Sequence, residues 1–447
     1  MSDAMTAAVT SPTPPAFHPA AMATMGPSTP FTWREGWRYG WLGFALAFVA
    51  LPLYVVLPHY YASRFGVPLA TLGALLLGAR LMDAVIDPLL GRWSDGLYRQ
   101  SQRAVLRWGA VAAVALAVGF ALLFFPQVQG ERALLLWVAL SLVLTYTAYS
   151  ALSILHQSWG ALQGGDEDMR GRVVAWREGM GLLGVVTASV TPLMLGMEAC
   201  TALFAAALAT GWWAWRSMVS GARCAMPPAA QPAPQHALWL PLTRPAFRVL
   251  LGVFLLNGIA SAIPATLILF FVQDRLQAPA DIQPLFLGLY FVCAALAIPL
   301  WLRCVVHIGL ARTWLAGMVL SVAVFVFAAQ LGAGDGAAFL LVCALSGAAL
   351  GADLTVPAAL LTGAIADHGD RGRAEGAYFG WWNFASKLNL ALAAGLALPA
   401  LQAWGYTPGA QDAAALQALT VAYCLLPCAL KLAAAALLYL RIIRKTP

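Results

Sequence analysis

Two aspartates, Asp83 and Asp87, lie four residues apart in the apolar segment LATLGALLLGARLMDAVIDPLLGRW. This spacing places both carboxylates on one face of a helix, one turn after Arg80. A charged side chain at the centre of a bilayer costs roughly 2.5–3.5 kcal/mol, so these groups need a partner or a water-filled cavity. We interpret the two aspartates as a site for a small cation or a proton. The alternative is a buried Arg80–Asp83 ion pair that only holds helices together.

Other oxygen atoms are expected beside the two carboxylates. Pro88 lacks an N–H group and therefore frees the carbonyl of Ala84, an oxygen of the kind that hard cations prefer. The segment TYTAYSALSIL contains Thr147, a candidate neutral oxygen ligand, and Tyr146, a candidate substrate contact. The alternative is that these hydroxyls bond to their own helix. Two close carboxylates also resist ionising together, so the coupling ion is either a proton or sodium.

The remaining buried polar residues are candidate substrate contacts. Lys387 lies too deep in its apolar segment to reach the surface easily, and we expect Asp353 to be its ion partner. Trp381 and Trp382 precede this lysine and would offer aromatic faces to a hydroxylated ligand. Arg177 would supply a second cation, and together these residues favour an acidic sugar over a neutral galactoside. The alternative is a neutral Lys387–Asp353 pair, with Arg177 facing the membrane interface.

The composition and the apolar runs of the chain indicate which secondary-structure elements carry these residues. The chain has 447 residues, of which 61% are hydrophobic and 10% charged, and its mean hydropathy is +0.76. Repeated apolar runs of about 20 residues indicate an all-α membrane protein that crosses the bilayer several times. We predict twelve spans, at about 39–61, 68–92, 105–126, 133–157, 174–197, 200–219, 246–272, 284–303, 313–331, 337–363, 376–402 and 413–440.

A Pro/Ala-rich stretch, MPPAAQPAPQ, divides these spans six and six. We therefore predict five regions: a disordered cytoplasmic tail (1–37), a six-helix bundle (38–220), a cytoplasmic linker (221–245), a second six-helix bundle (246–441) and a short cytoplasmic tail (442–447). Outside the spans, every Lys and Arg except Arg64, Arg132 and Arg275 falls on the side that holds both termini. This bias predicts that both termini are cytoplasmic, and it indicates topology rather than nucleic-acid binding.

Neither a metal centre nor a cofactor is indicated. The seven cysteines lie within or beside apolar segments without a CxxC pair, and the six histidines are scattered. HExxH and GxSxG motifs are absent, so the chain is not expected to be an enzyme. We expect no cofactor beyond the coupling ion, and no metal other than a sodium ion at Asp83 and Asp87.

Three segments in order resemble the glycoside–pentoside–hexuronide:cation symporters, the melibiose-carrier branch of the major facilitator superfamily. GARLMDAVIDPLLGRWSD is similar to the signature of their second helix, where the two aspartates take part in cation binding. WGALQGGDEDMRGRVVAWREGMGLLG resembles their fourth-to-fifth-helix loop, which leads to the arginine here at position 177. IADHGDRGRAEGAYFGWWNFASKL is similar to their tenth-to-eleventh-helix loop, with Arg373, Glu375 and Lys387 in the expected places.

The sequence also departs from the melibiose carrier. That carrier holds galactoside hydroxyls with acids on its first and fourth helices, and the alignment puts Ala47 and Ser150 at those positions. Ile86 replaces a polar residue before the second aspartate, which shifts the expectation for the coupling ion towards protons. At the cytoplasmic ends we expect ion pairs that hold an outward-facing state, formed by gating residues Arg80, Asp95, Arg371, Arg373 and Glu375.

The resemblance implies a secondary active transporter that moves a sugar-like or other small organic solute with a cation, by alternating access between two halves of the major facilitator fold. The expected location is a bacterial-type inner membrane, and the expected state is a monomer in the lipid bilayer. One alternative is a carrier of amphiphilic or lipid-like substrates on the same fold. A membrane receptor or an intramembrane enzyme is the remaining alternative, although the chain shows neither a soluble output domain nor a catalytic motif.

Overall fold

The computed structural model describes residues 31–67, 69–220, 238–279, 282–406 and 409–445, and these residues form helices and connections with no strand among them. Residues 31–447 form one compact unit. The predicted tail as far as residue 30 and linker residues 221–237 lie outside the described residues.

The first half of the chain contains helices α1 (Trp33–Phe48), α2 (Leu57–Phe65), α3 (Leu69–Gln100), α4 (Gln102–Phe124), α5 (Glu131–Leu162) and α6 (Glu167–Arg216). The second half contains α7 (Leu240–Thr243), α8 (Pro245–Phe270), α9 (Gln283–Ile308), α10 (Leu310–Ala328), α11 (Gly336–Asp367), α12 (Glu375–Ala403), α13 (Ala413–Thr420) and α14 (Leu426–Arg441). Wider π-helical turns at Pro52–Val56, Phe271–Arg275 and Val421–Leu425 join α1 to α2, extend α8, and join α13 to α14.

Nine helical segments of the described residues are long and apolar enough to cross a membrane, and each coincides with a predicted span. Predicted spans five and six both fall on α6, which kinks at Gly196, where φ is +82°. The other three predicted spans fall on the α1–α2 region, on α3 and on α12, of which the last two carry the buried charges discussed below.

The structure differs from the prediction at the start of the first helix. The first helix begins at Trp33 rather than after residue 37, because Thr32 and Glu35 form a capping box in which the Glu35 carboxylate accepts from the Thr32 N–H at 2.8 Å. Near the end of the linker, Leu240–Thr243 forms the short helix α7, and α8 follows directly. The sequence TWRE contains the capping signal that the hydropathy pattern overlooks.

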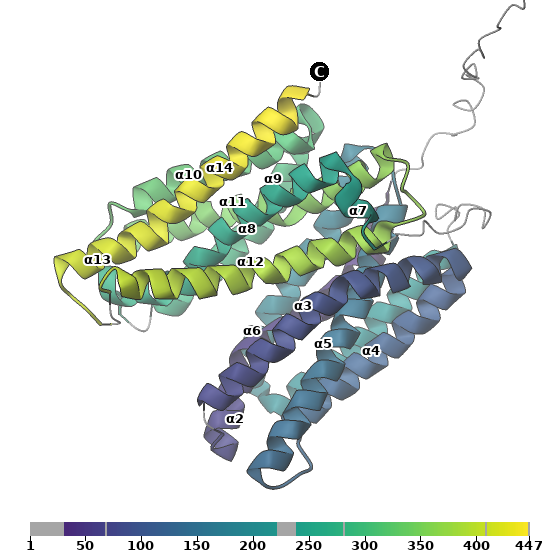
Figure 1. Cartoon of the computed structure of the whole chain (residues 1–447), viewed down its shortest axis with the longest axis horizontal. Coiled ribbons are helices and arrows are strands. Elements are labelled where there is room, and N and C mark those ends of the chain that lie inside the picture. The colour runs from purple at the N-terminus through teal and green to yellow at the C-terminus, as the bar shows by residue number, and fades with distance from the viewer. Residues whose placement is uncertain (1–30, 68, 221–237, 280–281, 407–408, 446–447) are drawn as a thin grey trace, which may run out of the picture. The chain divides into compact units, whose positions relative to one another are not determined.

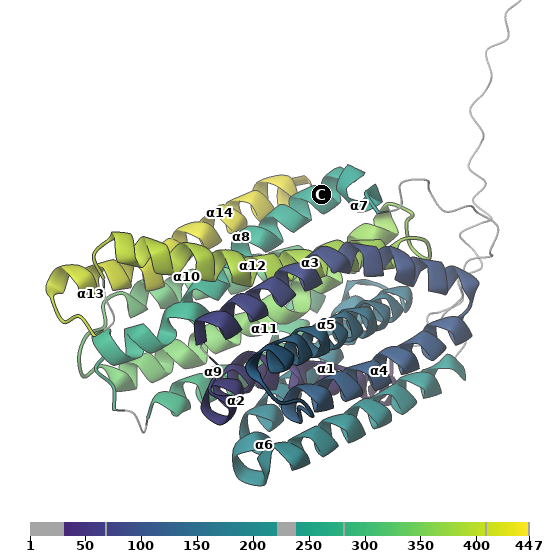
Figure 2. The same cartoon turned by 60° about the horizontal axis from the view of Figure 1, so that its bottom comes forward.

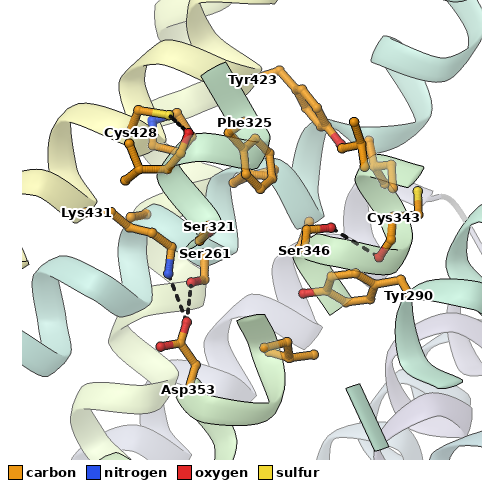
Figure 3. Close-up of a pocket in the computed structure, with 18 of the residues that line it drawn as sticks. Ser261, Tyr290, Ser321, Phe325, Cys343, Ser346, Asp353, Tyr423, Cys428 and Lys431 are labelled. Atoms are coloured by element: carbon orange, nitrogen blue, oxygen red, sulfur yellow. Dashed lines mark hydrogen bonds and ion pairs between the residues drawn. The ribbon is translucent and has the colours of Figure 1, made fainter. Parts of the chain in front are cut away.

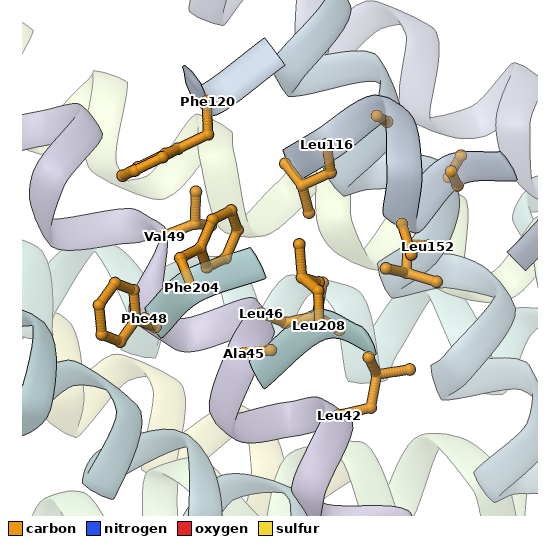
Figure 4. Close-up of a cluster of buried hydrophobic side chains, with 14 of the residues drawn as sticks. Leu42, Ala45, Leu46, Phe48, Val49, Leu116, Phe120, Leu152, Phe204 and Leu208 are labelled. Atoms are coloured by element: carbon orange, nitrogen blue, oxygen red, sulfur yellow. The ribbon is translucent and has the colours of Figure 1, made fainter. Parts of the chain in front are cut away.

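In the first half, α1 packs along α6, and α5 packs between α3 and α4. Their core holds apolar side chains from several helices, among them Phe48, Phe120 and Phe204 (Figure 4). The ring of Phe204 lies 5.7 Å from that of Phe48 and 4.7 Å from that of Phe120. In the second half, α11 contacts α9 and α10, and α8 contacts α12 and α14. The halves meet where α3 packs along α12 (Figures 1 and 2). They also meet where α6 packs against α9 and α11.

Candidate functional site

An ion cluster joins the two halves where α3 packs against α12. The Lys387 ammonium lies 2.6 Å from Asp83 Oδ2 and 2.7 Å from Asp87 Oδ2, and it also donates to Asp87 Oδ1 at 2.8 Å. Asp83 is 4% exposed and Asp87 is fully buried. Two carboxylates and one ammonium carry a formal charge of −1. Since a buried charge needs a partner, the arrangement favours binding of one further positive charge.

Ser150 of α5 completes this cluster. Its hydroxyl donates to Asp83 Oδ1 at 2.7 Å and accepts a hydrogen bond from the Lys387 ammonium at 2.8 Å. The resemblance places an acid at this position in sugar carriers. Here the position holds a neutral hydroxyl that is bonded within the ion cluster. Ser150, rather than the candidate ligand Thr147, therefore supplies the hydroxyl bonded to the carboxylates, and Thr147 is half-buried on the same helix.

Glycines allow α3 and α12 to come this close. A Cβ atom on Gly91 would lie 2.1 Å from the Gly376 carbonyl oxygen, and one on Gly380 would lie 2.6 Å from the Asp87 carbonyl oxygen. No real side chain fits at such distances, so the crossing requires glycine at these positions. The same contact sets Asp87 opposite Lys387, which lies two turns further along α12.

The predicted Lys387–Asp353 pair was wrong. Asp353 of α11 instead lies 2.9 Å from the ammonium of Lys431 on α14, and it accepts from Asn257 at 3.0 Å and from Trp314 at 2.9 Å. Depth along a helix indicates that both charges need a partner. It does not give the direction in which a side chain leaves its helix, and that direction decides the partner.

The second predicted cation, Arg177 of α6, is also paired. Its guanidinium contacts the carboxylate of the neighbouring Glu178, with an Nε to Oε1 distance of 2.9 Å. The expectation of an acidic sugar assumed that Lys387 and Arg177 are cations available to the ligand. Both instead have carboxylate partners, so this argument no longer supports an anionic solute.

The aromatic candidates do not form one group. Trp381 donates from its indole N–H to the Leu238 carbonyl at 2.8 Å, and its ring lies 5.4 Å from that of Trp239, beside α7. Trp382 stacks on Phe254 of α8 at 3.8 Å. Tyr146 is buried on α5, next to Arg80. Thus the two tryptophans face the second half, whereas Tyr146 and Arg80 lie in the first.

A family model described as MFS/sugar transport protein matches residues 38–445, which is most of the chain. The chain belongs to this family. Its members are transporters rather than enzymes, and the resemblance found in the sequence is thereby confirmed.

Two curated relatives match part of the chain. A putative glycoside/cation symporter of Escherichia coli, YagG, is 26% identical over 151 residues, which is 33% of this chain and 32% of that protein. An uncharacterized symporter of Bacillus subtilis, YjmB, is 24% identical over 168 residues, or 37% of each chain. The chain thus spans about a third of the length of the curated relatives it matches.

Solved structures show the same fold. A bacterial homologue of the iron transporter ferroportin, in an outward-facing state, has a TM-score of 0.66 at 17% identity over 90% of this chain and 99% of that one. The fucose:proton symporter FucP of E. coli has a TM-score of 0.64 at 13% identity over 90% and 98% of the two chains. The chain therefore has the major facilitator fold that was predicted from its sequence.

Next to the linker, contacts between helix ends connect the two halves of this transporter family member. Asp95 of α3 accepts from the first free N–H groups of α12, those of Gly376 at 2.6 Å and Ala377 at 2.9 Å. A carboxylate at a helix N-terminus satisfies these donors and interacts favourably with the helix dipole. Glu167 of α6 accepts from the N–H of Leu310, the first residue of α10, at 2.9 Å. We call these contacts the linker-end contacts.

The other gating candidates lie around the same helix ends. Arg371 donates to the carbonyl of Leu162, the last residue of α5, at 2.9 Å. Glu375 is buried and accepts from the N–H of Gly372, whereas Arg373 is exposed. Arg244 and Asp370 form a bidentate pair, with distances of 2.8 and 3.0 Å, that the sequence analysis did not anticipate.

Burial raises the pKa of Asp95, which lies beyond the predicted second span, and the nearby Glu375 carboxylate raises it further. Burial also raises the pKa of Glu375 to about 7, although hydrogen bonds to Gly372 and the charge of Arg371 oppose this effect. A solvated Glu has a pKa of about 4.3, so the closed arrangement binds a proton that an open one releases between these values. The stabilisation that the buried Glu375 gives to this arrangement of helix ends is therefore present at low pH and is lost as the pH rises towards 7.

Proposed function

We propose that the chain is a cation-coupled symporter of a small, sugar-like organic solute. The observation that supports this most strongly is the Asp83–Asp87–Lys387 cluster, because it combines a buried site of net negative charge with the contact between the two halves. The relatives named as glycoside/cation and uncharacterized symporters support the same class of activity. The coupling ion is a proton or sodium, held by Asp83 and Asp87.

In the proposed cycle, the coupling ion competes with the Lys387 ammonium for the two carboxylates. A bound cation weakens the bond between α3 and α12, which frees the halves to rock about a central solute site. Residues 38–220 and 246–441 act as these halves, in a bacterial-type inner membrane with both termini in the cytoplasm. We expect the protein to work as a monomer, with Tyr146, Arg177 and Trp382 nearest the solute path.

A thermal-shift screen of the purified chain tests this function. Small neutral and acidic sugars are compared with charged lysolipids, each with and without sodium at several pH values, because ligand binding to the folded state raises its apparent stability. A sugar-like solute is expected to raise the melting temperature, and sodium or a lower pH should strengthen the effect. Stabilisation by lysolipids alone, independent of ion and pH, would instead establish the amphiphile carrier.

The linker-end contacts are proposed to close the cytoplasmic side. Asp95→Ala removes two hydrogen bonds from backbone N–H groups, worth about 0.5–1.5 kcal/mol each, so the closed state should lose about tenfold in population. The readout is the rate at which a membrane-impermeant thiol reagent, added on the cytoplasmic side, modifies Thr362→Cys in a background without native cysteines. Thr362 lines a small cavity with Tyr39, Arg177 and Phe379, and it is 7% exposed.

Asp412→Ala is the matched control. Asp412 also caps a helix, accepting from the N–H of Ala415 at 2.9 Å, but it does so within its own segment. This variant should leave the labelling of Thr362→Cys unchanged. Equal labelling rates in the wild type and Asp95→Ala backgrounds would show that Asp95 is not a gate.

A further inference from the structure

A cavity with polar groups at one end lies inside the second half of the chain. It has a volume of about 140 Å³, and all its lining residues come from α8, α9, α10, α11, α14 and the turn before α14 (Figure 3). A single water needs about 10–15 Å³ of such space, so the cavity has room for a larger molecule. None of its lining residues belongs to α3, α5 or α12, which form the ion cluster. The cavity is therefore separate from the proposed coupling site.

One end of the cavity is formed by the Asp353–Lys431 pair. The Lys431 ammonium donates to Asp353 Oδ2 at 2.9 Å and to Asn257 at 2.8 Å, and Ser261 contacts the same carboxylate at 3.4 Å. The pair carries no net charge, and its members satisfy each other. A charged ligand would leave one buried charge without a partner, so this end favours an uncharged group that both donates and accepts.

Three hydroxyl groups face the cavity without a hydrogen bond to the described part of the chain, those of Tyr290, Ser321 and Tyr423. Ser321 is 5% and Tyr423 is 3% exposed. Hydroxyls in membrane helices usually bond to their own backbone, as Ser346 does in the same wall with the Cys343 carbonyl at 3.3 Å. Ser321 and Tyr423 are buried and Tyr290 is half-buried. Hydroxyls in such places normally have a partner, and a polar group inside the cavity would supply it.

Most of the wall, however, is apolar. Phe291, Phe325 and Phe339 line it together with aliphatic side chains and the two tyrosine rings. A polyol would bury several hydroxyls against this apolar surface, at about 1–3 kcal/mol for each hydroxyl without a partner. A purely apolar molecule would leave the three wall hydroxyls unsatisfied. The best match is an uncharged ring compound with one or two hydroxyl groups on one edge.

We propose that this cavity is a binding site for a small uncharged alicyclic or aromatic alcohol, held by the Tyr290, Ser321 and Tyr423 hydroxyls and by the Asp353–Lys431 pair. The ring would pack against the phenylalanines. Its hydroxyl would replace the water that these polar groups otherwise need. This site does not depend on the transported solute or on the coupling ion.

Two native cysteines report occupancy. Cys343 and Cys428 line the cavity as free thiols, whereas Cys200 is a free thiol buried in the first half. The purified full-length protein is treated with methyl methanethiosulfonate in the presence of cyclohexanol, and modification of each cysteine is followed by peptide mass spectrometry. We expect cyclohexanol to slow modification of Cys343 and Cys428 saturably while leaving Cys200 unaffected.

Comparison probes and variants define the chemistry. Methylcyclohexane and myo-inositol should each need at least about tenfold higher concentration for equal protection. Tyr290→Phe and Ser321→Ala should each lower the affinity for cyclohexanol about fivefold, which corresponds to the loss of roughly one hydrogen bond. Asp87→Asn should not alter the protection, because Asp87 lies outside the cavity.

Three outcomes would overturn the proposal: no saturable protection by cyclohexanol in the wild type, equal protection by methylcyclohexane, or unchanged protection in both hydroxyl variants. Ser321→Phe, which fills the cavity, should abolish protection in any protein that retains its wild-type elution profile. If that variant does not fold, the protection measured in the conservative Tyr290→Phe and Ser321→Ala variants still tests whether the cavity binds cyclohexanol.

Discussion

Asp87→Asn is expected to abolish gradient-driven accumulation of the solute while leaving the protein folded in the membrane. In the wild type, Asp83, Asp87 and Lys387 sum to −1, and Asp87 is fully buried. The asparagine keeps the size of the side chain but reduces the cluster to a neutral Asp83–Lys387 pair. A neutral buried pair has no electrostatic reason to bind a further cation.

The measurement is solute uptake into proteoliposomes with an imposed sodium or proton gradient. In Asp87→Asn the solute should only equilibrate across the membrane without accumulating, because the neutral Asp83–Lys387 pair that remains no longer couples uptake to the ion gradient. Solute exchange at equal concentrations, which needs no ion gradient, should persist and would show that the variant is intact. Asp335→Asn is the matched control, because Asp335 is a loop residue that accepts from the Gly332 N–H at 2.8 Å.

Accumulation at the wild-type level in Asp87→Asn would contradict the assignment of the coupling site. Loss of both accumulation and exchange would instead indicate that Asp87 is needed for the solute pathway itself. Loss in the Asp335→Asn control would point to damage unrelated to the ion cluster.

The sequence identified the charged members of the ion cluster but not their connections. Asp83, Asp87 and Lys387 stand out because a charge in an apolar span is costly and must have a reason. Pairing depends on the rotation and crossing of helices, which hydropathy does not encode. Lys387 was therefore assigned to Asp353, although it lies against α3.

Ser150 and Lys431 were missed for a related reason. Ser150 was interpreted as one of several hydroxyls that could line a cavity and as the absence of a sugar-binding acid. Its bond to Asp83 becomes visible only once α5 is placed beside α3. Lys431 was not among the candidate residues, yet it is 4% exposed and bonded to Asn257 and Asp353. Neither position has a local pattern that distinguishes it from an ordinary serine or a lysine near a helix end.

The linker-end contacts illustrate which gating details a sequence can predict. Asp95 and Glu375 were chosen because acids at helix ends in both halves suggest a gate. Ion pairs were expected there, whereas Asp95 binds backbone N–H groups of α12. The glycine pair that allows this approach, Gly91 and Gly376, lies in segments where single glycines are common and carries no signal by itself.

Gly91→Val is the second change with a large expected effect. A Cβ atom at Gly91 would lie 2.1 Å from the Gly376 carbonyl oxygen, and backbone atoms on both helices leave it no room. Overpacking costs about 1–3 kcal/mol even in cores that can adjust, and this crossing is backbone against backbone. The closed contact between α3 and α12 should therefore be lost, while each half keeps its own core.

We expect Gly91→Val to eliminate solute accumulation and to raise the labelling of Thr362→Cys from the linker side at least about tenfold, which corresponds to about 1.4 kcal/mol. Gly78→Val is the matched control: Gly78 lies on the same helix, and a Cβ atom there meets nothing within 4 Å. Gly78→Val should transport and label as the wild type does. Normal transport by Gly91→Val would show that the halves need not close through this crossing, and the role proposed for the ion cluster in joining them would then be wrong.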